Sequence, residues 1–368
     1  MLDCAEVKLE VVGRLGCISL NRTKALNALS LPMIRSLGKA LNDWAICSTV
    51  DAVALRGISK SGPFGNFCVG GDIRFFYEAA QIGNPELEDF FTEEYELNHL
   101  IHNYRKPIIA FMDGIVIGGG MGLTQGASYR IVTEKSRLSM PETLIGLFPD
   151  VGGGFFLSKL ENDLGRYLAL TGDQVLAKEA LNIGWADFFI SSELMPTIWE
   201  DLSTLKSITP EAIKKNLTLL PSPQLEQPSF KIELITKHFS KNSIKEIIHS
   251  LESEQSTWAI DVASKLRKRS PLMLHVVFEQ IKRAKGMSLS DELRMERDMV
   301  RHCFHSHHLN RFGPQTETVE GIRAMVIDKD HQPSWYPSRI EDVNPEMINQ
   351  FFESPWPSFS HPLRDLIG

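Results

Sequence analysis

The segment "SMPETLIGLFPDVGGGFF", residues 139–156, places two acids, Glu142 and Asp150, in an otherwise apolar stretch. Glu142 follows a proline, and Asp150 stands between a proline and a triple glycine. Because proline and glycine mark turns, both acids are expected on turns. An apolar pocket disfavours an ionised carboxylate, and a second carboxylate nearby raises one pKa of the pair further. The segment therefore predicts two acids with different proton affinities, which suits acid–base chemistry.

On either side of this segment, the first half of the chain alternates strand-like and helix-like stretches. Strands are expected at residues 6–12, 16–22, 50–57, 106–114 and 129–133. Helices are expected at residues 31–44 with Ser30 as N-cap, from near Asp72, at 85–104 and from the glycines at 118–120. This order predicts an α/β core with sites at the strand-to-helix turns.

After about Ile190 the sequence becomes mainly helical. The helical segments are 210–217, 243–253, 271–285 and 288–308, and "PSPQLEQPSF" (221–230) is typical of a linker. We therefore expect a catalytic core over residues 1–190 and a mainly helical C-terminal region over residues 191–368.

Composition excludes several classes of partner. The 368 residues carry a net charge of −7 with no basic stripe, so no nucleic acid is expected. No apolar run is long enough for a membrane span, and the first ten residues, "MLDCAEVKLE", contain acids and no signal-type apolar region, which predicts a cytoplasmic protein. The five cysteines are scattered without a CxxC pair, so reduced thiols are expected.

Two glycine-rich turns are candidates for binding an oxygen atom through backbone N–H groups. "IGGGMGLTQG" (117–126) lacks the GxGxxG spacing because Leu123 takes the third glycine's place, and phosphate binding is disfavoured. Tight helix packing is the alternative role for a single glycine run. "FCVGGDI" (67–73) adds a second turn, in which Gly71 precedes a helix with Asp72 as N-cap. Two such turns predict an oxyanion hole.

Two other features are expected to be structural. His302, His305, His307 and His308 fit neither HExxH nor a Cys/His zinc pattern, so we expect a helix end and no metal site. Cys68 lies beside the second glycine turn without an evident basic partner, and it is expected to be a small core residue rather than a nucleophile.

Four ordered motifs together resemble the crotonase (enoyl-CoA hydratase/isomerase) superfamily. They are "NRTKALNALSLPMI" (21–34), "FCVGGDI" (67–73), "DGIVIGGGMGL" (113–123) and "MPETLIGLFPDVGGGFFL" (140–157). The last two, with "EGIRAMVIDKD" (320–330), are similar to its 3-hydroxyisobutyryl-CoA hydrolase branch. The resemblance implies a spiral core of repeated strand-strand-helix units, with the helical C-terminal region covering the site.

The resemblance also implies roles for the turns and acids. Gly71 and Gly119 match the family's two amides that hold the thioester oxygen. Gly122 stands where hydratases carry one catalytic acid, whereas Glu142 matches the other. Asp150 replaces a glycine typical of hydratases. Glu142 is then expected to act as nucleophile, through a mixed anhydride, or as base on water, with Asp150 moving protons or orienting the 3-hydroxyl; the sequence does not divide these roles.

Substrate contacts are implied at further positions. Glu94 matches a substrate-binding glutamate of the hydrolase branch, although the adjacent Glu93 makes a solvated helix face the alternative. Lys24, and Arg22 as a further candidate, are cations that could contact the phosphates of coenzyme A. The alternative for Lys24 is an ordinary surface lysine. Thr23 replaces the proline that is common at this position in the family. The residues that the resemblance places at coenzyme A are Lys24, Ala25, Leu26, Asp72 and Ile73.

The expected activity is hydrolysis of a short 3-hydroxyacyl-CoA, namely 3-hydroxyisobutyryl-CoA to 3-hydroxyisobutyrate and coenzyme A in valine catabolism. The resemblance implies no metal and no redox cofactor, and a homo-oligomer is compatible with the sequence. Enoyl-CoA hydratase or isomerase activity and non-catalytic acyl-CoA binding are the alternatives; Gly122 disfavours the first, and the joint presence of Glu142 and Asp150 disfavours the second.

Overall fold

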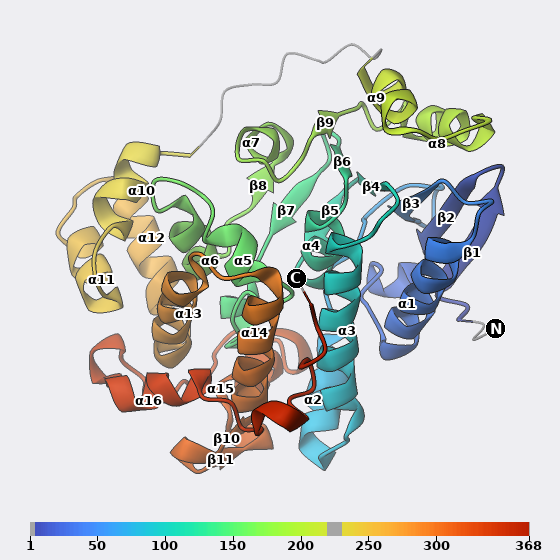
Figure 1. The fold of residues 1–368 in the computed structure, drawn as a ribbon. Helices are drawn as coiled ribbons and strands as arrows, with labels where there is room; N and C mark the ends of the chain where they lie inside the picture. Colours follow the sequence, from blue (N-terminus) through green and yellow to red (C-terminus); the bar gives the residue numbers. More distant parts are fainter. Residues whose placement is uncertain (1–3, 219–229, 368) are drawn as a thin grey trace. The chain divides into compact units, whose positions relative to one another are not determined.

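The computed structural model describes residues 4–218 and 230–367 (Figure 1). Their Cα atoms form two compact units, each built from three stretches of chain. Unit 1 contains the described parts of Met1–Gly71, Glu96–Ser139 and Gln174–Ser229, and unit 2 those of Asp72–Tyr95, Met140–Asp173 and Phe230–Gly368. The expected linker at 221–230 lies outside the described residues except for Phe230. The functional division at residue 190 stays a prediction.

Unit 1 is organised around a six-stranded sheet in the order β1-β2-β3-β4-β6-β9. Only β1 and β2 are antiparallel; the other pairs are parallel. The strands are β1 (Val7–Val12), β2 (Leu15–Leu20), β3 (Ala52–Gly57), β4 (Ile108–Met112), β6 (Tyr129–Val132) and β9 (Phe188–Phe189). Every residue of β2 and β4 is buried, as expected for strands covered on both faces. The strands expected from the sequence are confirmed within a few residues at their ends.

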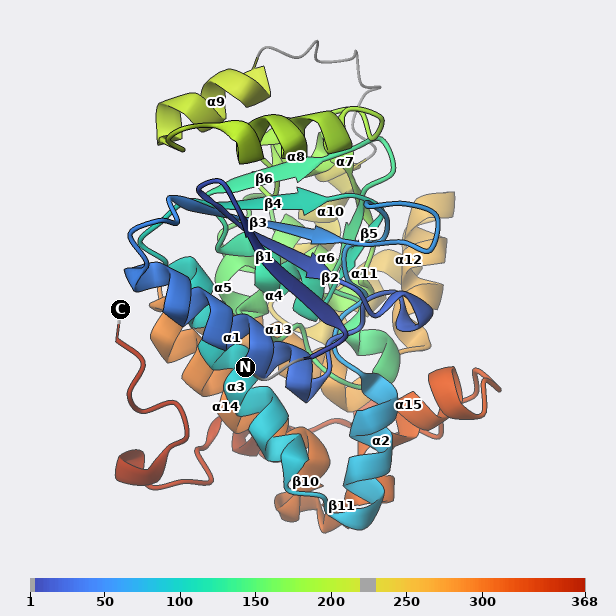
Figure 2. The same cartoon turned by 90° about the vertical axis from the view of Figure 1, so that its right-hand side faces the viewer.

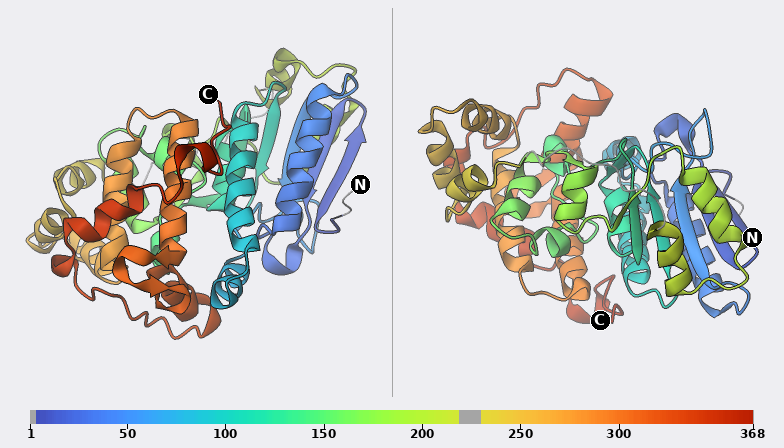
Figure 3. Two further views of the ribbon diagram at one scale, coloured as in Figure 1. Left: turned by 60° about the horizontal axis from the view of Figure 1, so that its bottom comes forward. Right: turned by 90° about the horizontal axis from the view of Figure 1, so that it is seen from above.

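Helices cover both faces of this sheet. Met195, Trp199 and Leu202 of α8 (Met195–Thr204) pack with Phe111 and Ile131 of the sheet in one buried cluster, which α9 (Pro210–Thr218) extends. The opposite face carries α1 (Leu31–Ile46), as Figures 2 and 3 show. Within unit 1, the central strands of the sheet are therefore covered on both faces, whereas the edge strand β1 is exposed after Val7.

The N-terminus of α1 differs in one detail from the expected cap. Ser30 occupies the N-cap position, but its hydroxyl makes no cap hydrogen bond and instead donates to Glu6 Oε2 at 2.7 Å. Pro32 lies in the first turn as expected. The start of the helix was thus predicted correctly and the role of the Ser30 side chain was wrong, because a long-range carboxylate competes for the hydroxyl.

A second, three-stranded sheet in the order β5-β7-β8 was not expected from the sequence. It comprises β5 (Ile115–Ile117), β7 (Arg137–Ser139) and β8 (Val175–Leu176). Each of β4 and β6 is followed directly by a strand of this second sheet, and α4 (Gly119–Gln125) follows β5. β4, β5 and α4 form the strand-strand-helix unit that the family resemblance implied. The new strands are too short to show a period of two, so the pattern alone did not reveal them.

Unit 2 is helical. Its principal helices are α2 (Ile73–Ile82), the first ten residues of α3 (Glu86–His102), α5 (Gly153–Leu157), α6 (Leu164–Thr171), α10 (Ile232–Phe239), α11 (Ile244–Glu252), α12 (Thr257–Arg267), α13 (Pro271–Ala284), α14 (Leu289–Phe304), α15 (Glu317–Ile322) and α16 (Pro345–Asn349). Tyr167 of α6 packs edge-on against Phe239 of α10 and stacks on Trp258 of α12. Ser243, Ser270 and Ser288 cap their helices through their hydroxyl oxygens. The helical C-terminal region is confirmed.

The C-terminal motif at residues 320–330 forms a local ion-pair hub. Arg323 contacts Glu320, Asp328 and Asp330 at 2.8, 2.7 and 2.6 Å. One guanidinium thus fixes the end of α15 and the chain that follows it. The hub gives this motif a structural role within unit 2.

Candidate active site

Glu142 begins a short 3₁₀ helix, η2 (Glu142–Ile145), directly after Pro141. The Thr143 hydroxyl donates to the Leu170 carbonyl at 3.2 Å, and the Leu147 N–H donates to the Glu142 carbonyl at 3.1 Å. Gly146 ends η2 at φ +65°, where a Cβ would lie 2.5 Å from the Glu317 carbonyl oxygen. The turn is therefore rigidly packed, and it carries a Glu142 side chain whose Oε2 is buried without a hydrogen-bond partner among the described residues.

Asp150 lies on a tight turn with a left-handed backbone. Val151 and Gly152 have φ values of +56° and +85°, and the Gly153 N–H donates to the Asp150 carbonyl at 2.8 Å. A valine at positive φ costs on the order of 1–3 kcal/mol, which surrounding contacts must offset. Tyr95 of α3 donates its phenolic hydroxyl to Asp150 Oδ2 at 3.0 Å. The turn therefore presents Asp150 with one fixed donor.

Glu94, Glu142 and Asp150 belong to one buried group in unit 2, with exposed fractions of 2%, 7% and 6%. Burial raises the pKa of Glu142 well above its usual range, and the charges of Asp150 and Glu94 raise it further. Burial, then the charge of Asp150, likewise raises the pKa of Glu94. Burial raises the pKa of Asp150 to about 7, although the hydrogen bond from Tyr95 favours its ionised form.

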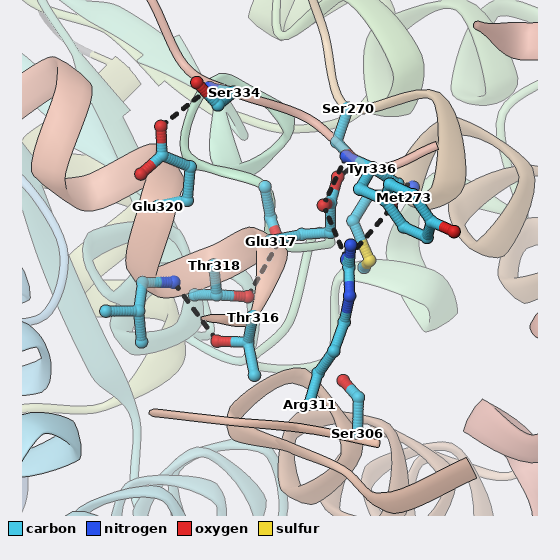
Figure 4. A network of polar contacts seen from close by, with 12 residues as sticks. Ser270, Met273, Ser306, Arg311, Thr316, Glu317, Thr318, Glu320, Ser334 and Tyr336 are labelled. Carbon is cyan, nitrogen blue, oxygen red and sulfur yellow. Dashed lines mark hydrogen bonds and ion pairs between the residues drawn. The ribbon is translucent and has the colours of Figure 1, made fainter. Parts of the chain in front are cut away.

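This electrostatic arrangement differs from that of a structural buried acid. Glu317, also in unit 2, accepts hydrogen bonds from the Ser270 hydroxyl, from the Tyr336 N–H at 2.9 Å and from Arg311 at 3.2 Å (Figure 4). Its charge is thus compensated by a cation. In the acidic group, by contrast, the charges that act on Glu94 and Glu142 are those of other acids. An uncompensated group of this kind is typical of a catalytic site.

The structure decides one alternative that the sequence left open. Glu94 is buried, whereas Glu93 is only partly buried, so the solvated-face interpretation is wrong for Glu94. Its Oε1 has no hydrogen-bond partner among the described residues. The assignment of Glu94 to substrate binding stays a prediction.

Four further residues belong to this group and were missed by the sequence analysis. They are Tyr95, Gln280, Glu292 and Glu296, and each is buried. Glu292 and Glu296 lie one turn apart on α14 among buried apolar residues, a pattern that sequence reasoning could have noticed. No sequence pattern marks Tyr95 and Gln280 as part of this group, because only the fold brings them close to Asp150 and its turn.

In unit 1, the two glycine turns adjoin each other. The Cys68 N–H donates to the Ile115 carbonyl at 3.1 Å, and the Ile117 N–H donates to the Cys68 carbonyl at 2.9 Å. Gly70 has φ +95°, and a Cβ there would lie 3.6 Å from the Gly119 nitrogen. Gly119 is the first residue of α4, where N–H groups have no intrahelical acceptor. The N–H groups of Gly71 and Gly119 donate no hydrogen bond within the described part of the chain.

The residues expected at coenzyme A divide between exposed and structural positions. Lys24 and Leu26 are exposed, Ala25 is half-buried, and Leu26 is left-handed at φ +50°. Arg22 pairs with Glu6 at 2.9 Å and donates to the Ala28 carbonyl at 3.2 Å, so it is held by the protein. In unit 2, Asp72 caps α2 as expected by accepting from the Phe75 N–H at 3.2 Å, and Ile73 begins that helix.

The histidines and cysteines occupy structural positions. α14 ends at Phe304; beyond it, His308 contacts the Met347 carbonyl at 3.1 Å, while His302 in its last turn contacts the Glu353 carbonyl at 2.8 Å. Over residues 4–218 and 230–367, no group of three or more His, Cys, Asp or Glu side chains is arranged to hold a metal. All five cysteines are free thiols, and Cys68 is fully buried, as expected.

Comparison with known proteins identifies the class. The profile described as enoyl-CoA hydratase/isomerase matches residues 15–352. A carnitinyl-CoA dehydratase from Mycobacterium thermoresistibile has the same fold, with a TM-score of 0.85 and 28% identity over 98% of this chain and 99% of that one. An enoyl-CoA hydratase from Rhodobacter sphaeroides matches with a TM-score of 0.82 and 30% identity, over 95% of this chain and 98% of that one. The chain belongs to the enoyl-CoA hydratase/isomerase, or crotonase, family.

Within this family, the chain is similar to proteins named mitochondrial 3-hydroxyisobutyryl-CoA hydrolase. The Danio rerio protein is 40% identical over 95% of this chain and 90% of its own length. The Homo sapiens protein is 37% identical over 95% of this chain and 89% of its own length. No helix in the described part of this chain is long and apolar enough to span a membrane.

Proposed function

We propose that this protein hydrolyses the thioester of a short 3-hydroxyacyl-CoA, with 3-hydroxyisobutyryl-CoA as substrate. The observation that carries the proposal is the burial of Glu142 beside a second acid, Asp150, at positions where Glu142 Oε2 has no partner among the described residues. Similarity to proteins named for this hydrolase supports the choice of substrate. The products are 3-hydroxyisobutyrate and coenzyme A.

The coupled acids suggest how protons move. Because the charge of one acid raises the pKa of the other, the pair holds one proton readily near neutral pH. In the reactive arrangement the proton shared by the pair lies on Asp150. The Glu142 carboxylate then attacks the thioester carbon, the C–S bond breaks, and Asp150 gives its proton to the departing thiolate. Water then attacks the acyl carbon of the mixed anhydride, the bond between that carbon and the Glu142 oxygen breaks, and Asp150 accepts a proton from the water. The acyl group leaves as the free acid, and Glu142 is again a carboxylate.

For unit 1 we propose binding roles. The N–H groups of Gly71 and Gly119 are proposed donors to the thioester oxygen, and one such donor contributes about 2.7–4 kcal/mol in a comparable oxyanion hole. The exposed Lys24, with Ala25 and Leu26, is proposed to contact coenzyme A, as are Asp72 and Ile73 in unit 2. Glu94 is proposed to bind the acyl group. These assignments follow the family motifs.

Enoyl-CoA hydration is the second candidate, because the two solved relatives above are titled as a dehydratase and a hydratase. Gly122 argues against it, since a glycine cannot supply the second acid of the hydratases.

Non-catalytic acyl-CoA binding is disfavoured because burying uncompensated carboxyls costs stability without benefit to binding alone. The pathway, valine catabolism, and the cytoplasmic location stay proposals, and the relatives' names say mitochondrial.

Two substrates distinguish these functions. Release of free thiol from 3-hydroxyisobutyryl-CoA is expected, whereas crotonyl-CoA is expected to keep its enoyl absorbance. In Glu142→Gln, kcat for thiol release should fall by about 10³ or more because the nucleophile is lost. Glu317→Gln is the matched control, because it neutralises a buried acid of the same unit whose charge is compensated by Arg311; it should lower stability and leave kcat unchanged.

The outcomes separate the candidates. Loss of enoyl absorbance without thiol release would establish the hydratase alternative. Binding of both substrates without turnover would establish the non-catalytic one. Undiminished hydrolysis in Glu142→Gln would remove Glu142 from the mechanism.

A further inference from the structure

The turn that carries Asp150 is held by two side chains from distant helices. Glu296 of α14 accepts hydrogen bonds from the Gly152 N–H at 2.8 Å and the Gly154 N–H at 3.1 Å. Gln280 of α13 donates through Nε2 to the Pro149 carbonyl at 2.7 Å. The backbone is therefore fixed immediately before and after Asp150.

The two holding side chains also support each other. Gln280 Nε2 donates to Glu296 Oε1 at 3.2 Å, and both residues have an exposed fraction of 0%. Glu296 thus accepts three N–H hydrogen bonds, which is the environment of an ionised carboxylate. No side chain of the turn itself contributes to this set.

A second acid lies beside Glu296. Glu292, one turn earlier on α14, is fully buried, and neither of its oxygens accepts a hydrogen bond from a donor group in the described residues. A Cβ on Gly154 would lie 2.2 Å from Glu292 Oε1, so this acid reaches the backbone of α5. Two adjacent buried carboxyl groups can form a hydrogen bond with each other only if one of them is protonated. Burial and the charge of Glu292 raise the pKa of Glu296 as well, but Glu296 already accepts three N–H donors, so the geometry favours the proton on Glu292.

We propose that Glu296 and Gln280 are positioning residues that set the direction of the Asp150 side chain. Protonated Glu292 completes the arrangement by donating to Glu296. Val151 adopts a left-handed conformation that a β-branched residue does not favour without such contacts. The inference rests on the proposed function only where it assigns Asp150 a part in catalysis.

The first test does not depend on activity. Glu296→Gln keeps the side-chain shape but leaves one acceptor oxygen, so its NH₂ group faces the N–H of either Gly152 or Gly154. Hydrogen exchange at the glycine amide that loses its acceptor should become faster by about 10-fold or more. Glu292→Gln is the matched variant on the same helix: its amide still donates to Glu296, so both glycine amides should stay protected. Unchanged exchange in Glu296→Gln would overturn the inference.

The second test is kinetic. Glu296→Gln should lower kcat for thiol release by about 10- to 100-fold with KM changed less than about threefold, since misplacement of a reacting group acts on the chemical step. Gln280→Met removes the donor to Pro149 and should act in the same direction. If Glu296→Gln does not fold, Gln280→Met alone tests the positioning role. Glu317→Gln changes a side chain that contacts Ser270, Arg311 and Tyr336 (Figure 4), and it should leave kcat unchanged.

A double-mutant cycle separates positioning from general stabilisation. If Glu296 acts through Asp150, then Glu296→Gln should cause no further loss of kcat once Asp150→Asn is present. Additive losses would overturn the positioning role. Full activity in Asp150→Asn alone would instead contradict the proposed function, and the exchange experiment would still decide whether Glu296 holds the turn.

Discussion

At the scale of single residues, the contact between Tyr95 and Asp150 shows how one hydrogen bond sets a proton affinity. Burial alone drives the pKa of Asp150 upward, and the phenolic hydroxyl, 3.0 Å from Oδ2, opposes that rise. Asp150 therefore titrates near neutral pH, with a pKa of about 7, rather than staying protonated. A group of this kind can both accept and release a proton during turnover.

Tyr95→Phe should raise the apparent pKa that the acid pair shows in kinetics. The change removes the donor that favours ionised Asp150, so the pKa of Asp150 should move above about 7, and the corresponding limb of the kcat profile should move to higher pH. The measurement is kcat between pH 5 and 9. Tyr104→Phe is the control, because its hydroxyl donates to the Leu41 carbonyl in unit 1. A profile that does not move in Tyr95→Phe would show that Asp150 does not govern it.

At the scale of elements, the three glycines before α5 serve different purposes. Gly152 supplies a left-handed conformation, at φ +85°. Gly153 leaves little room for a methyl group, since a Cβ would lie 3.0 Å from Pro149 Cβ and Pro149 would have to shift slightly. Gly154 lets Glu292 approach the backbone, because a Cβ on residue 154 would lie only 2.2 Å from Glu292 Oε1. The triple glycine therefore reflects the chain's path and its packing against α14.

Gly154→Ala should destabilise the protein by about 1–3 kcal/mol, because the added methyl group overlaps Glu292 and lies 3.1 Å from Ala284 Cβ. Urea unfolding measures the loss. Gly38→Ala, in the middle of α1 with nothing within 4 Å of the added atom, should instead stabilise by about 0.5–1 kcal/mol. Equal effects of the two changes would mean that the contact with Glu292 is not tight.

At the scale of the whole molecule, the buried acids make the stability of the fold depend on pH. The folded-state pKa of Asp150, about 7, lies above its ordinary value of 3.8, so the folded chain binds this proton more tightly than the unfolded chain. The stability contributed by this proton is fully present at low pH and is lost as the pH rises through about 7. Glu94, Glu142 and Glu292, whose pKa values are also raised by burial, act in the same direction.

Asp150→Asn should remove part of this dependence. Relative to the parent protein, the free energy of unfolding of the variant should increase by roughly 2 to 3 kcal/mol between pH 5 and pH 8. Asp51→Asn is the control: Arg14 holds the pKa of Asp51 at about 2, so this carboxyl is ionised throughout the range and the difference should stay constant. Urea unfolding at several pH values checks both, and parallel curves for Asp150→Asn and the parent would contradict the raised pKa.

The sequence by itself determined what short-range patterns encode. Alternating apolar runs and glycine turns predicted the strands of the main sheet except the two-residue β9. Cap residues such as Asp72 and Ser288 predicted helix starts, and ordered motifs predicted the family. Glu142 and Asp150 were recognisable because their flanking prolines and glycines are contiguous with them. The short second sheet was not predicted, since strands of two or three residues leave no period to detect.

Only the tertiary structure decided which side chains surround the acids. Gln280 and Glu296 lie 131 and 144 residues from the turn atoms that they contact, and Tyr95 lies 55 residues from Asp150. No local pattern records such contacts, because they arise when whole helices pack together. The pKa of a carboxyl likewise depends on burial and on its neighbours in space. The sequence thus supplied the reacting groups, and folding set their charge states.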